Sequence, residues 1–99
     1  MIVRITSAAE ADLEAIADWI VRDSPGRALT FVAELRDACM TLAELPEGYA
    51  LVPRYEASGV RRRVHGNYLI FYCIDNEGID VLHVLHGARD YEPILFPES

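Results

Sequence analysis

The segment VRRRVHGNYLIFYCIDNEGIDVLHVLHGARDY, residues 60–91, predicts the sheet on which the rest of the chain packs. Its two runs at 68–74 and 79–85 are apolar, rich in β-branched and aromatic residues, and too short for typical helices. Residues 75–78, Asp-Asn-Glu-Gly, have the composition of a hairpin turn, because Asp and Asn tolerate turn conformations and Gly adopts positive φ. An arginine triplet at 61–63 precedes a second turn signal at 65–67. These features predict an antiparallel meander.

The residues before this segment predict one short strand and a helical hairpin. Residues 2–5 have the β-branched content of a strand. Ser7 and Glu10 have the spacing of a capping box, and apolar residues then recur at helical spacing until the break at 23–26. Ser24 and Pro25 predict the start of a second helix, whose apolar stripe ends near Leu45. The order β-α-α-β-β-β predicts an α+β fold, one helical hairpin packed on one small antiparallel sheet, in a single domain covering residues 1–99.

Composition and charge limit the classes of function that this chain can have. No apolar run is long enough to span a membrane, and residues 1–14 lack the features of a signal peptide, so we expect a cytoplasmic protein. The formal net charge of −7 argues against general nucleic-acid binding, which depends on summed positive charge. Cys39 and Cys73 have no metal-ligand spacing and are expected to be buried free thiols. We expect no cofactor and no metal site. His83 and His86 are three apart on a strand and should point to opposite faces.

Chain length, element order and the motifs LIFYCID and VLHVLHGARDY together resemble the ParE toxins of the RelE/ParE superfamily, the toxin halves of type II toxin–antitoxin operons in bacteria. The segment EADLEAIADWI is similar to the usual first helix of that family, and GARD is the most specific match. The resemblance covers nearly the whole chain. It implies a growth-inhibiting toxin without catalytic residues of its own. It also implies binding to a protein target, DNA gyrase for several ParE members, and neutralisation by a ParD-like antitoxin in a hetero-oligomer.

The superfamily also contains RelE-like ribosome-dependent mRNA endonucleases, which provide the alternative function. RNA cleavage needs a base, an acid and cations over the scissile phosphate. The candidates in this chain are Arg61 and Arg62 of the triplet and the set Arg63, His65, Arg89 and Tyr91. RelE-like nucleases typically have an arginine after the tyrosine matched by Tyr68, where this chain has Leu69. Their C-terminal catalytic tyrosine or histidine falls where this chain has Ile94, Leu95 and Phe96. The resemblance therefore favours a binding toxin, and a member that has lost toxicity is a third possibility.

Five residues are candidates for partner binding: Trp19, Arg61, Arg62, Arg63 and Arg89. Trp19 is either part of the core, which we favour, or an exposed anchor. Because side chains alternate across a strand, Arg61 and Arg63 should share one face while Arg62 takes the other. The helices should cover one of the two faces, and at least one guanidinium of the triplet should find a carboxylate there. We expect the face without helices to be open and basic and to contact the antitoxin or the target. Exchange of Arg61 and Arg63 together for Glu should weaken antitoxin binding with the fold intact. Arg89 either pairs with a carboxylate such as Asp90 or contacts a target.

The acidic stripe of the first predicted helix has two interpretations. Glu10, Glu14 and Asp18 recur four residues apart and therefore lie on one helix face. The stripe is either a solvated face, which we favour, or a docking surface for a basic partner segment.

Overall fold

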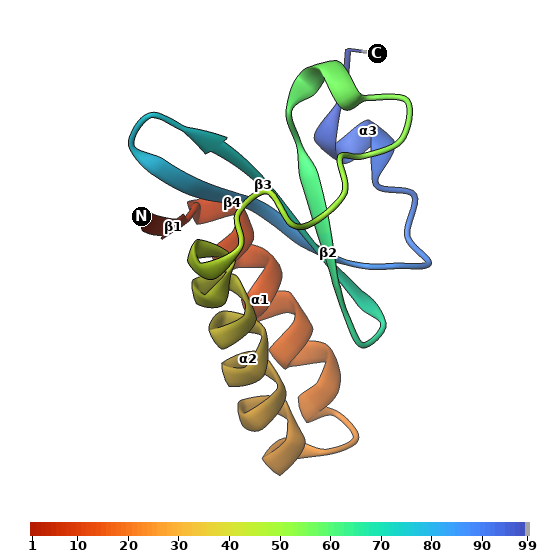
Figure 1. Ribbon diagram of the computed structural model, residues 1–99. Coiled ribbons are helices and arrows are strands. Elements are labelled where there is room, and N and C mark those ends of the chain that lie inside the picture. Colours follow the sequence, from red (N-terminus) through yellow and green to blue (C-terminus); the bar gives the residue numbers. More distant parts are fainter. Residues whose placement is uncertain (99) are drawn as a thin grey trace.

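The computed structural model describes residues 1–98 and has the predicted α+β fold (Figure 1). Two long helices form a hairpin after the first strand, and three further strands follow. Short 3₁₀ turns at Thr41–Glu44 and Glu56–Ser58 lie in the connection between hairpin and meander. The elements are β1 (Ile2–Ile5), α1 (Ser7–Val21), α2 (Pro25–Met40), β2 (Arg61–His65), β3 (Tyr68–Asp75), β4 (Gly78–His86) and α3 (Glu92–Leu95).

The sheet has the strand order β1-β4-β3-β2 and is mixed. The predicted meander of β2, β3 and β4 is antiparallel, but β1 pairs parallel with β4, from Ile2 opposite Gly78 to Ile5 opposite Val81. The prediction of a wholly antiparallel sheet is wrong in this one strand. The prediction rested on the two hairpin turns, and a hairpin turn determines the direction of pairing only for the two strands that it joins. β1 instead reaches β4 through a long crossover, which parallel pairing allows.

A bulge in β4 shifts the alternation of its side chains. Phe71 is opposite His83 and Tyr72 is opposite Val81, so Leu82 has no partner in β3. The extra residue lets Val81 and Val84 enter the same core although they are three positions apart.

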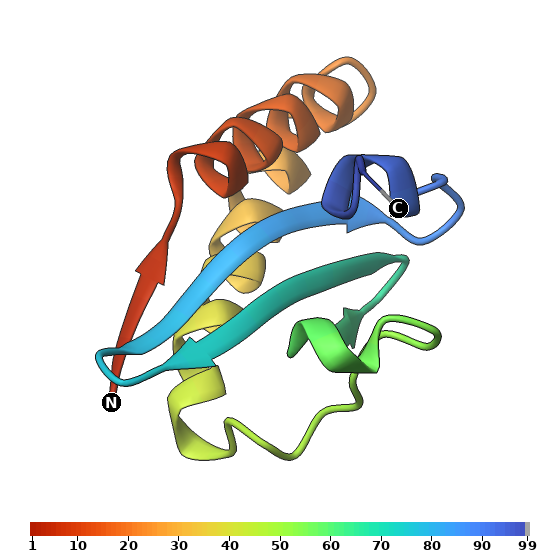
Figure 2. The same cartoon turned by 90° about the horizontal axis from the view of Figure 1, so that it is seen from above.

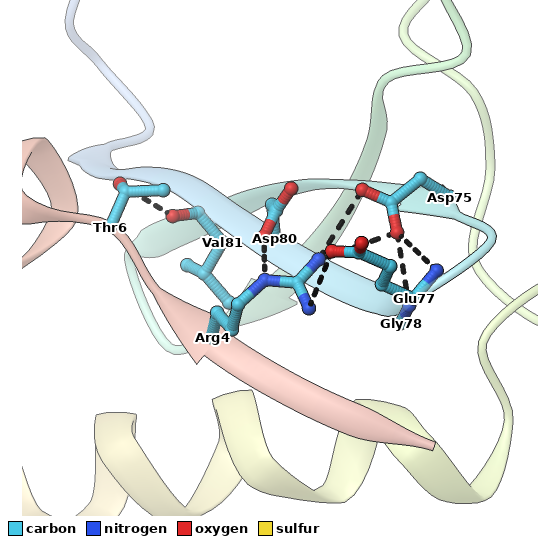
Figure 3. Close-up of polar contacts among 7 residues, drawn as sticks. All are labelled: Arg4, Thr6, Asp75, Glu77, Gly78, Asp80 and Val81. Carbon is cyan, nitrogen blue, oxygen red and sulfur yellow. Dashed lines mark hydrogen bonds and ion pairs between the residues drawn. The ribbon is translucent and has the colours of Figure 1, made fainter.

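The first helix begins one residue earlier than predicted. Thr6, not Ser7, is the N-cap: its Oγ1 accepts a hydrogen bond from the Ala9 amide at 3.2 Å and donates to the Val81 carbonyl at 2.7 Å (Figure 3). The second bond fixes Thr6 to β4, which sets the point where strand becomes helix. Glu10 does not close a capping box, because both of its oxygens bind Arg36 at 2.7 and 2.6 Å. One member of the predicted acidic stripe is therefore paired within the fold.

Two apolar clusters lie on opposite faces of the sheet, and Figure 1 shows the α1–α2 hairpin on one side of the β3–β4 ribbon and α3 on the other. The larger cluster packs the hairpin, through Leu13, Ile16 and Leu35, against Tyr72 and Ile79. The smaller cluster covers the second face. Its buried members are Val52, Val60, Phe71 and Leu85, with Tyr55, Tyr91, Ile94, Leu95 and Phe96 packed around them.

The expectation of an open, basic second face is therefore wrong. The loop before β2 and the C-terminal segment, which Figure 2 shows from above, supply its cover. The C-terminal segment docks on this face through residues 94–96, and Ser99 lies outside the described residues.

Arg4 links β1 to the β3–β4 hairpin (Figure 3). Its guanidinium lies 2.6 Å from Asp80 and 3.3 Å from Asp75, and the hydrogen bond to Asp80 raises its pKa. Asp75 also accepts the amides of Glu77 and Gly78, and the Glu77 bond is the main reason that the pKa of Asp75 is lowered. Gly78 has φ +148°, and a Cβ there would lie 2.1 Å from the Ile2 carbonyl oxygen. The parallel pairing therefore requires glycine at this position.

Across residues 1–98, every helix is too short or too polar to traverse a lipid bilayer.

Candidate partner-binding groove

β4 extends beyond the strand that pairs with it. β1 ends at Ile5, opposite Val81, whereas β4 continues to His86. α1 runs beside the unpaired part, and Asp12 occupies the place of the missing strand. Its Oδ2 accepts the Val84 amide at 2.9 Å and lies 2.8 Å from His83 Nδ1. The carboxylate thus satisfies a backbone donor that would otherwise be left without a protein partner.

Past Asp12, α1 and the end of β4 enclose a hollow of about 360 Å³. Trp19 stands at its edge with 64% of its surface exposed. The expectation of a core tryptophan is therefore wrong. At 3.6 residues per turn, Trp19 is rotated about 90° from the centre of the stripe that Leu13, Ile16 and Ile20 direct into the core. The hollow is lined by Asp12, Ala15, Ile16, Trp19, Tyr68, Val84, Leu85, His86 and Arg89.

A second hollow, of about 350 Å³, lies next to the first and shares Trp19, Tyr68 and His86 with it. Its remaining lining comes from α1, α2 and the β2–β3 turn, namely Ile20, Arg27, Phe31 and Asn67. Aromatic rings connect the two: the Tyr68 ring lies 5.4 Å from Phe31 and 5.1 Å from His86, between centroids. We call the two hollows together the Trp19 groove.

The rim of the Trp19 groove is cationic although the chain is acidic. The Arg22 guanidinium lies over the Trp19 ring at 5.4 Å, and Arg27 lies over Phe31 at 5.0 Å. Arg27 also binds Glu34 at 3.1 Å, which lowers the pKa of that carboxyl. Arg89 differs from the other arginines of residues 1–98, because its guanidinium has no ion pair, hydrogen bond or ring contact there. Each of the other eight arginines contacts a carboxylate, a carbonyl, a hydroxyl or an aromatic ring; they are Arg4, Arg22, Arg27, Arg36, Arg54, Arg61, Arg62 and Arg63. Its expected pairing with Asp90 is absent from the described residues.

The arginine triplet divides between the two faces of the sheet as predicted, but its partners are not carboxylates. Arg63 donates to the Ala38 carbonyl at 2.7 Å and to Thr41 Oγ1 at 2.6 Å. Arg61 donates to the Tyr49 carbonyl at 2.7 Å. Arg62, on the other face, donates to the Tyr91 hydroxyl at 3.0 Å.

The expectation that at least one guanidinium of the triplet pairs with a carboxylate near the helices is therefore wrong for the described residues. Carbonyls near the C-terminal end of a helix lack intrahelical donors and attract cations, so the Ala38 carbonyl takes that place for Arg63. For Arg61 the acceptor is the Tyr49 carbonyl in the following loop. All three guanidinium groups of the triplet thus make contacts within the fold.

The described residues contain no group of three or more metal-ligating side chains suited to a metal ion. Both cysteines are free. Cys39 is buried, and burial raises the pKa of its thiol to about 11. Cys73 is only half-buried, contrary to expectation, because it lies opposite Asp80 on the second face, beyond the C-terminal cover. Burial, the main cause, and the neighbouring carboxylates raise its pKa.

Comparison with known proteins identifies the family. The family model described as the ParE toxin of the type II toxin–antitoxin system parDE matches residues 3–91. The chain belongs to the ParE toxin family. It is therefore a toxin of the type II toxin–antitoxin class.

Two solved structures are similar to this ParE-family chain. The chromosomal ParDE system from P. aeruginosa matches with a TM-score of 0.74 and 25% identity, covering 87% of this chain and 95% of that one. The toxin–antitoxin complex RelBE2 from Mycobacterium tuberculosis matches with a TM-score of 0.62 and 26% identity, covering 85% and 94%. A search of curated proteins gives no match.

The structure distributes the candidate nuclease residues of this ParE toxin over several places. Arg63 binds the end of α2, and the His65 ring lies 6.1 Å from Phe31, so both are on the hairpin face. Tyr91 packs on Phe71 on the opposite face, with ring centroids 4.8 Å apart. Arg89 lines the Trp19 groove. The described geometry does not assemble these side chains around one point.

Trp19 and Arg89 are candidates already visible in the sequence, whereas Asp12 and the groove itself were not predicted. Asp12, Ala15 and Trp19 are spaced i, i+3 and i+7, which places them on one flank of α1. That spacing could have indicated a common surface. The spacing does not show which strand lies opposite this flank, because that depends on where β1 stops pairing with β4.

Proposed function

We propose that this ParE-family toxin acts in the cytoplasm, arrests growth by binding DNA gyrase, and is held inactive by a ParD-like antitoxin. The observation that carries the proposal is the combination of the family match with an exposed, cation-rimmed apolar groove. A groove of this kind suits a protein ligand, because apolar floors and aromatic anchors dominate the energetics of protein interfaces.

In this proposal Trp19 and Arg89 contact the partner, and Arg61, Arg62 and Arg63 stabilise the fold. The assignment follows from the contacts. Trp19 and Arg89 face the groove, whereas the triplet is hydrogen-bonded to Tyr49, Tyr91 and Ala38.

The test measures gyrase supercoiling of relaxed plasmid with purified toxin, first alone and then with the ParD-like protein encoded beside it. We expect inhibition or trapped cleaved DNA, and reversal when the antitoxin is added. Unaffected supercoiling at high toxin excess, for a chain that still arrests growth, would refute gyrase as the target. Cells that grow normally during toxin expression would favour a member that has lost toxicity.

A RelE-like endonuclease is the second candidate, and the similarity to the RelBE2 structure favours it. Acid–base cleavage of RNA needs its catalytic groups within reach of one phosphate. Arg63 and Tyr91 pack on opposite faces of the sheet, which supports the binding toxin instead. Primer extension on mRNA from cells that express the toxin distinguishes the two: new cleavage sites within translated codons, lost on Arg89→Ala, would establish the nuclease.

A further inference from the structure

We infer that β1 is a pairing edge for a second copy of the chain, so that two sheets join through antiparallel β1 strands about a two-fold axis at Val3. The inference does not depend on the proposed target or antitoxin, because it concerns a different surface. Its evidence is an open strand edge, a group of exposed apolar side chains beside it, and a register in which opposite charges meet.

The outer edge of β1 carries backbone groups without a protein partner. In a parallel pair, the amide and carbonyl of every second residue point to the same neighbouring strand. The Thr6 amide donates to the Val81 carbonyl at 3.2 Å, so the even-numbered residues of β1 point toward β4. The amides and carbonyls of Val3 and Ile5 therefore point outward, and they form no hydrogen bond within residues 1–98. Figure 2 shows β1 at the outer side of the sheet, with no element of the described chain beyond it.

The opposite edge of the sheet is covered where β2 begins. The segment before β2 folds back along that strand, and the Arg62 amide donates to the Ala50 carbonyl at 3.0 Å. Natural sheets guard an uncovered edge with a charged side chain, a proline or a bulge, because the edge would otherwise pair with another chain. The only charged side chain of β1 is that of Arg4, and its guanidinium is turned onto Asp80 at 2.6 Å. The edge of β1 is therefore both open and unguarded.

Exposed apolar side chains gather beside this edge. The 3₁₀ turn Thr41–Glu44 packs next to β1. Of the eight exposed large hydrophobic residues within residues 1–98, four lie in β1 or flank β1 and that turn: Met1, Ile2, Met40 and Leu45. A two-fold axis perpendicular to the sheet places both helical hairpins on the same side, so the 3₁₀ turns of the two copies approach each other. Pairing of the edges thus removes apolar surface from water as well as satisfying the backbone.

The sequence of β1 selects one register. With Val3 opposite Val3 of the second copy, Met1 lies opposite Ile5 and Ile2 lies opposite Arg4. Each outward amide and carbonyl of Val3 and Ile5 then gains a backbone partner. A register centred on Arg4 would place two arginines directly opposite each other, which is unfavourable. The register centred on Val3 is therefore favoured.

This register also brings a cation to the acidic β3–β4 turn. Three carboxylates surround the single Arg4 guanidinium there, those of Asp75, Glu77 and Asp80 (Figure 3). Arg4 of the second copy lies opposite Ile2, which pairs with Gly78, the residue after Glu77. Neighbouring strands are about 4.8 Å apart, so the second guanidinium comes within reach of Glu77. The Glu77 side chain is 83% exposed and lies 3.9 Å from its own Arg4. This charge complementarity favours a second copy of the chain as the occupant of the edge.

The dimer leaves the Trp19 groove of both copies open. The residues that line the groove lie outside β1 and outside residues 40–45. In the antiparallel arrangement, α1 of the second copy begins beside Met1, at the end of β1 that is remote from the groove. Each copy therefore keeps its own groove free for a partner.

The experiment measures the mass of the purified chain by sedimentation equilibrium over a concentration series. We expect a shift toward about 22 kDa, twice the 11.1 kDa of one chain. Val3→Pro removes an outward amide without touching the pairing with β4, and Ile2→Lys places a charge at an already exposed position of the edge. Each should raise the Kd of the dimer at least about tenfold. Val64→Lys is the control, because Val64 is an exposed apolar residue of β2, and it should dimerise like the parent chain.

Circular dichroism melts establish that each variant is folded, and Ile2→Lys remains informative if Val3→Pro unfolds. The charge contact is tested with Glu77→Gln, which should raise the Kd of the dimer about threefold. An unchanged Kd for Glu77→Gln would refute the contact with Arg4 of the second copy.

Oxidative cross-linking tests the register. In a Cys73→Ser background, where the remaining Cys39 is buried, Val3→Cys should form a disulfide-linked dimer. The Cα atoms of a hydrogen-bonded antiparallel pair are about 5.5 Å apart, which suits a disulfide. Ile5→Cys is the matched control, because in this register the two copies of residue 5 lie about 14 Å apart along the strands. Cross-linking of Ile5→Cys in place of Val3→Cys would refute the register.

Three results would overturn the inference as a whole. The first is a monomer at every concentration of the series. The second is a dimer that persists in both Val3→Pro and Ile2→Lys, which would place the interface elsewhere. The third is a monomeric chain whose affinity for the antitoxin falls on Val3→Pro, which would assign the edge to the antitoxin. Because the readout is mass, the outcome is independent of whether the chain inhibits gyrase.

Discussion

Replacing Arg63 with Ala tests whether the arginine triplet stabilises the fold or binds a partner. The Arg63 side chain crosses from β2 to the end of α2, where it donates to the Ala38 carbonyl and Thr41 Oγ1 and lies 5.1 Å over the Tyr49 ring. Ala38 keeps a hydrogen bond from Thr41 Oγ1 at 3.0 Å after the change, so its carbonyl is not left without a donor. The substitution therefore removes contacts without burying an unpaired group.

The expected loss of stability follows from those contacts. A hydrogen bond to a charged group contributes about 1.5–3 kcal/mol when buried, and the half-exposed position of Arg63 selects the lower value. The cation–π contact adds about 0.5 kcal/mol and the helix C-terminus about 0.3 kcal/mol. Because these contributions overlap, we expect a loss of about 2 kcal/mol in the free energy of unfolding. For a domain of this size that lowers Tm by about 10 °C. Arg63→Lys keeps the positive charge but not the planar, forked guanidinium, and it should lower the free energy of unfolding by about half as much.

The assay combines thermal melts with antitoxin titration. Arg54→Ala is the matched control, because Arg54 is largely exposed and its ion pair with Glu92 should contribute at most about 1 kcal/mol. We expect Arg63→Ala to melt earlier and to bind antitoxin, below its Tm, with parent-like affinity. An unchanged Tm together with weakened binding would refute the structural role of Arg63 and would show that the triplet contacts the partner.

Three further changes test other parts of the structure. Asp12→Ala leaves the Val84 amide without its acceptor and should lower the free energy of unfolding by about 1–3 kcal/mol in urea titrations; an unchanged midpoint would show that water replaces the carboxylate. The Arg36 hydrogen bond lowers the pKa of Glu10 in the folded state, so its contribution to stability is present above the ordinary value of 4.5 and is lost as the pH falls through the folded value. Glu10→Gln should accordingly flatten the decline of Tm in acid, and a parallel decline in both proteins would contradict the role of this pair. With its pKa raised to about 11, Cys39 should resist thiol reagents at pH 8 until the chain unfolds, whereas rapid labelling of native Cys73→Ser protein would show that the hairpin core opens.

The fold was predictable because its signals are local. The apolar runs of β3 and β4, the turn at residues 75–78 and the break before Pro25 each lie within a few residues of the element they specify. The parallel pairing of β1 was not predictable in this way. Four residues of strand carry too little pattern to select a partner, and the choice is made by Arg4 and Thr6 through contacts more than seventy positions away.

The site was less predictable, because its partners are not visible in the sequence. The triplet binds backbone carbonyls, which every residue has, so the expected carboxylates could not be distinguished from them. Trp19 was expected in the core, but its angle on the helix places it outside the core-facing stripe. For Arg89, the neighbouring Asp90 in the sequence suggests an ion pair, but the described residues show no ion pair between these two side chains.

The exposure of Trp19 follows from the packing of α1. Burying it would require a rotation of the helix by about 90°, since it lies that far from the core-facing stripe. The same rotation would take Leu13, which is 1% exposed, and Ile20, which packs against the larger cluster, out of the core and would separate Asp12 from the Val84 amide. Each buried aliphatic side chain contributes about 1.5–3 kcal/mol, so two of them outweigh one tryptophan. The packing of α1 therefore keeps Trp19 on the surface of the fold, where a partner can cover it.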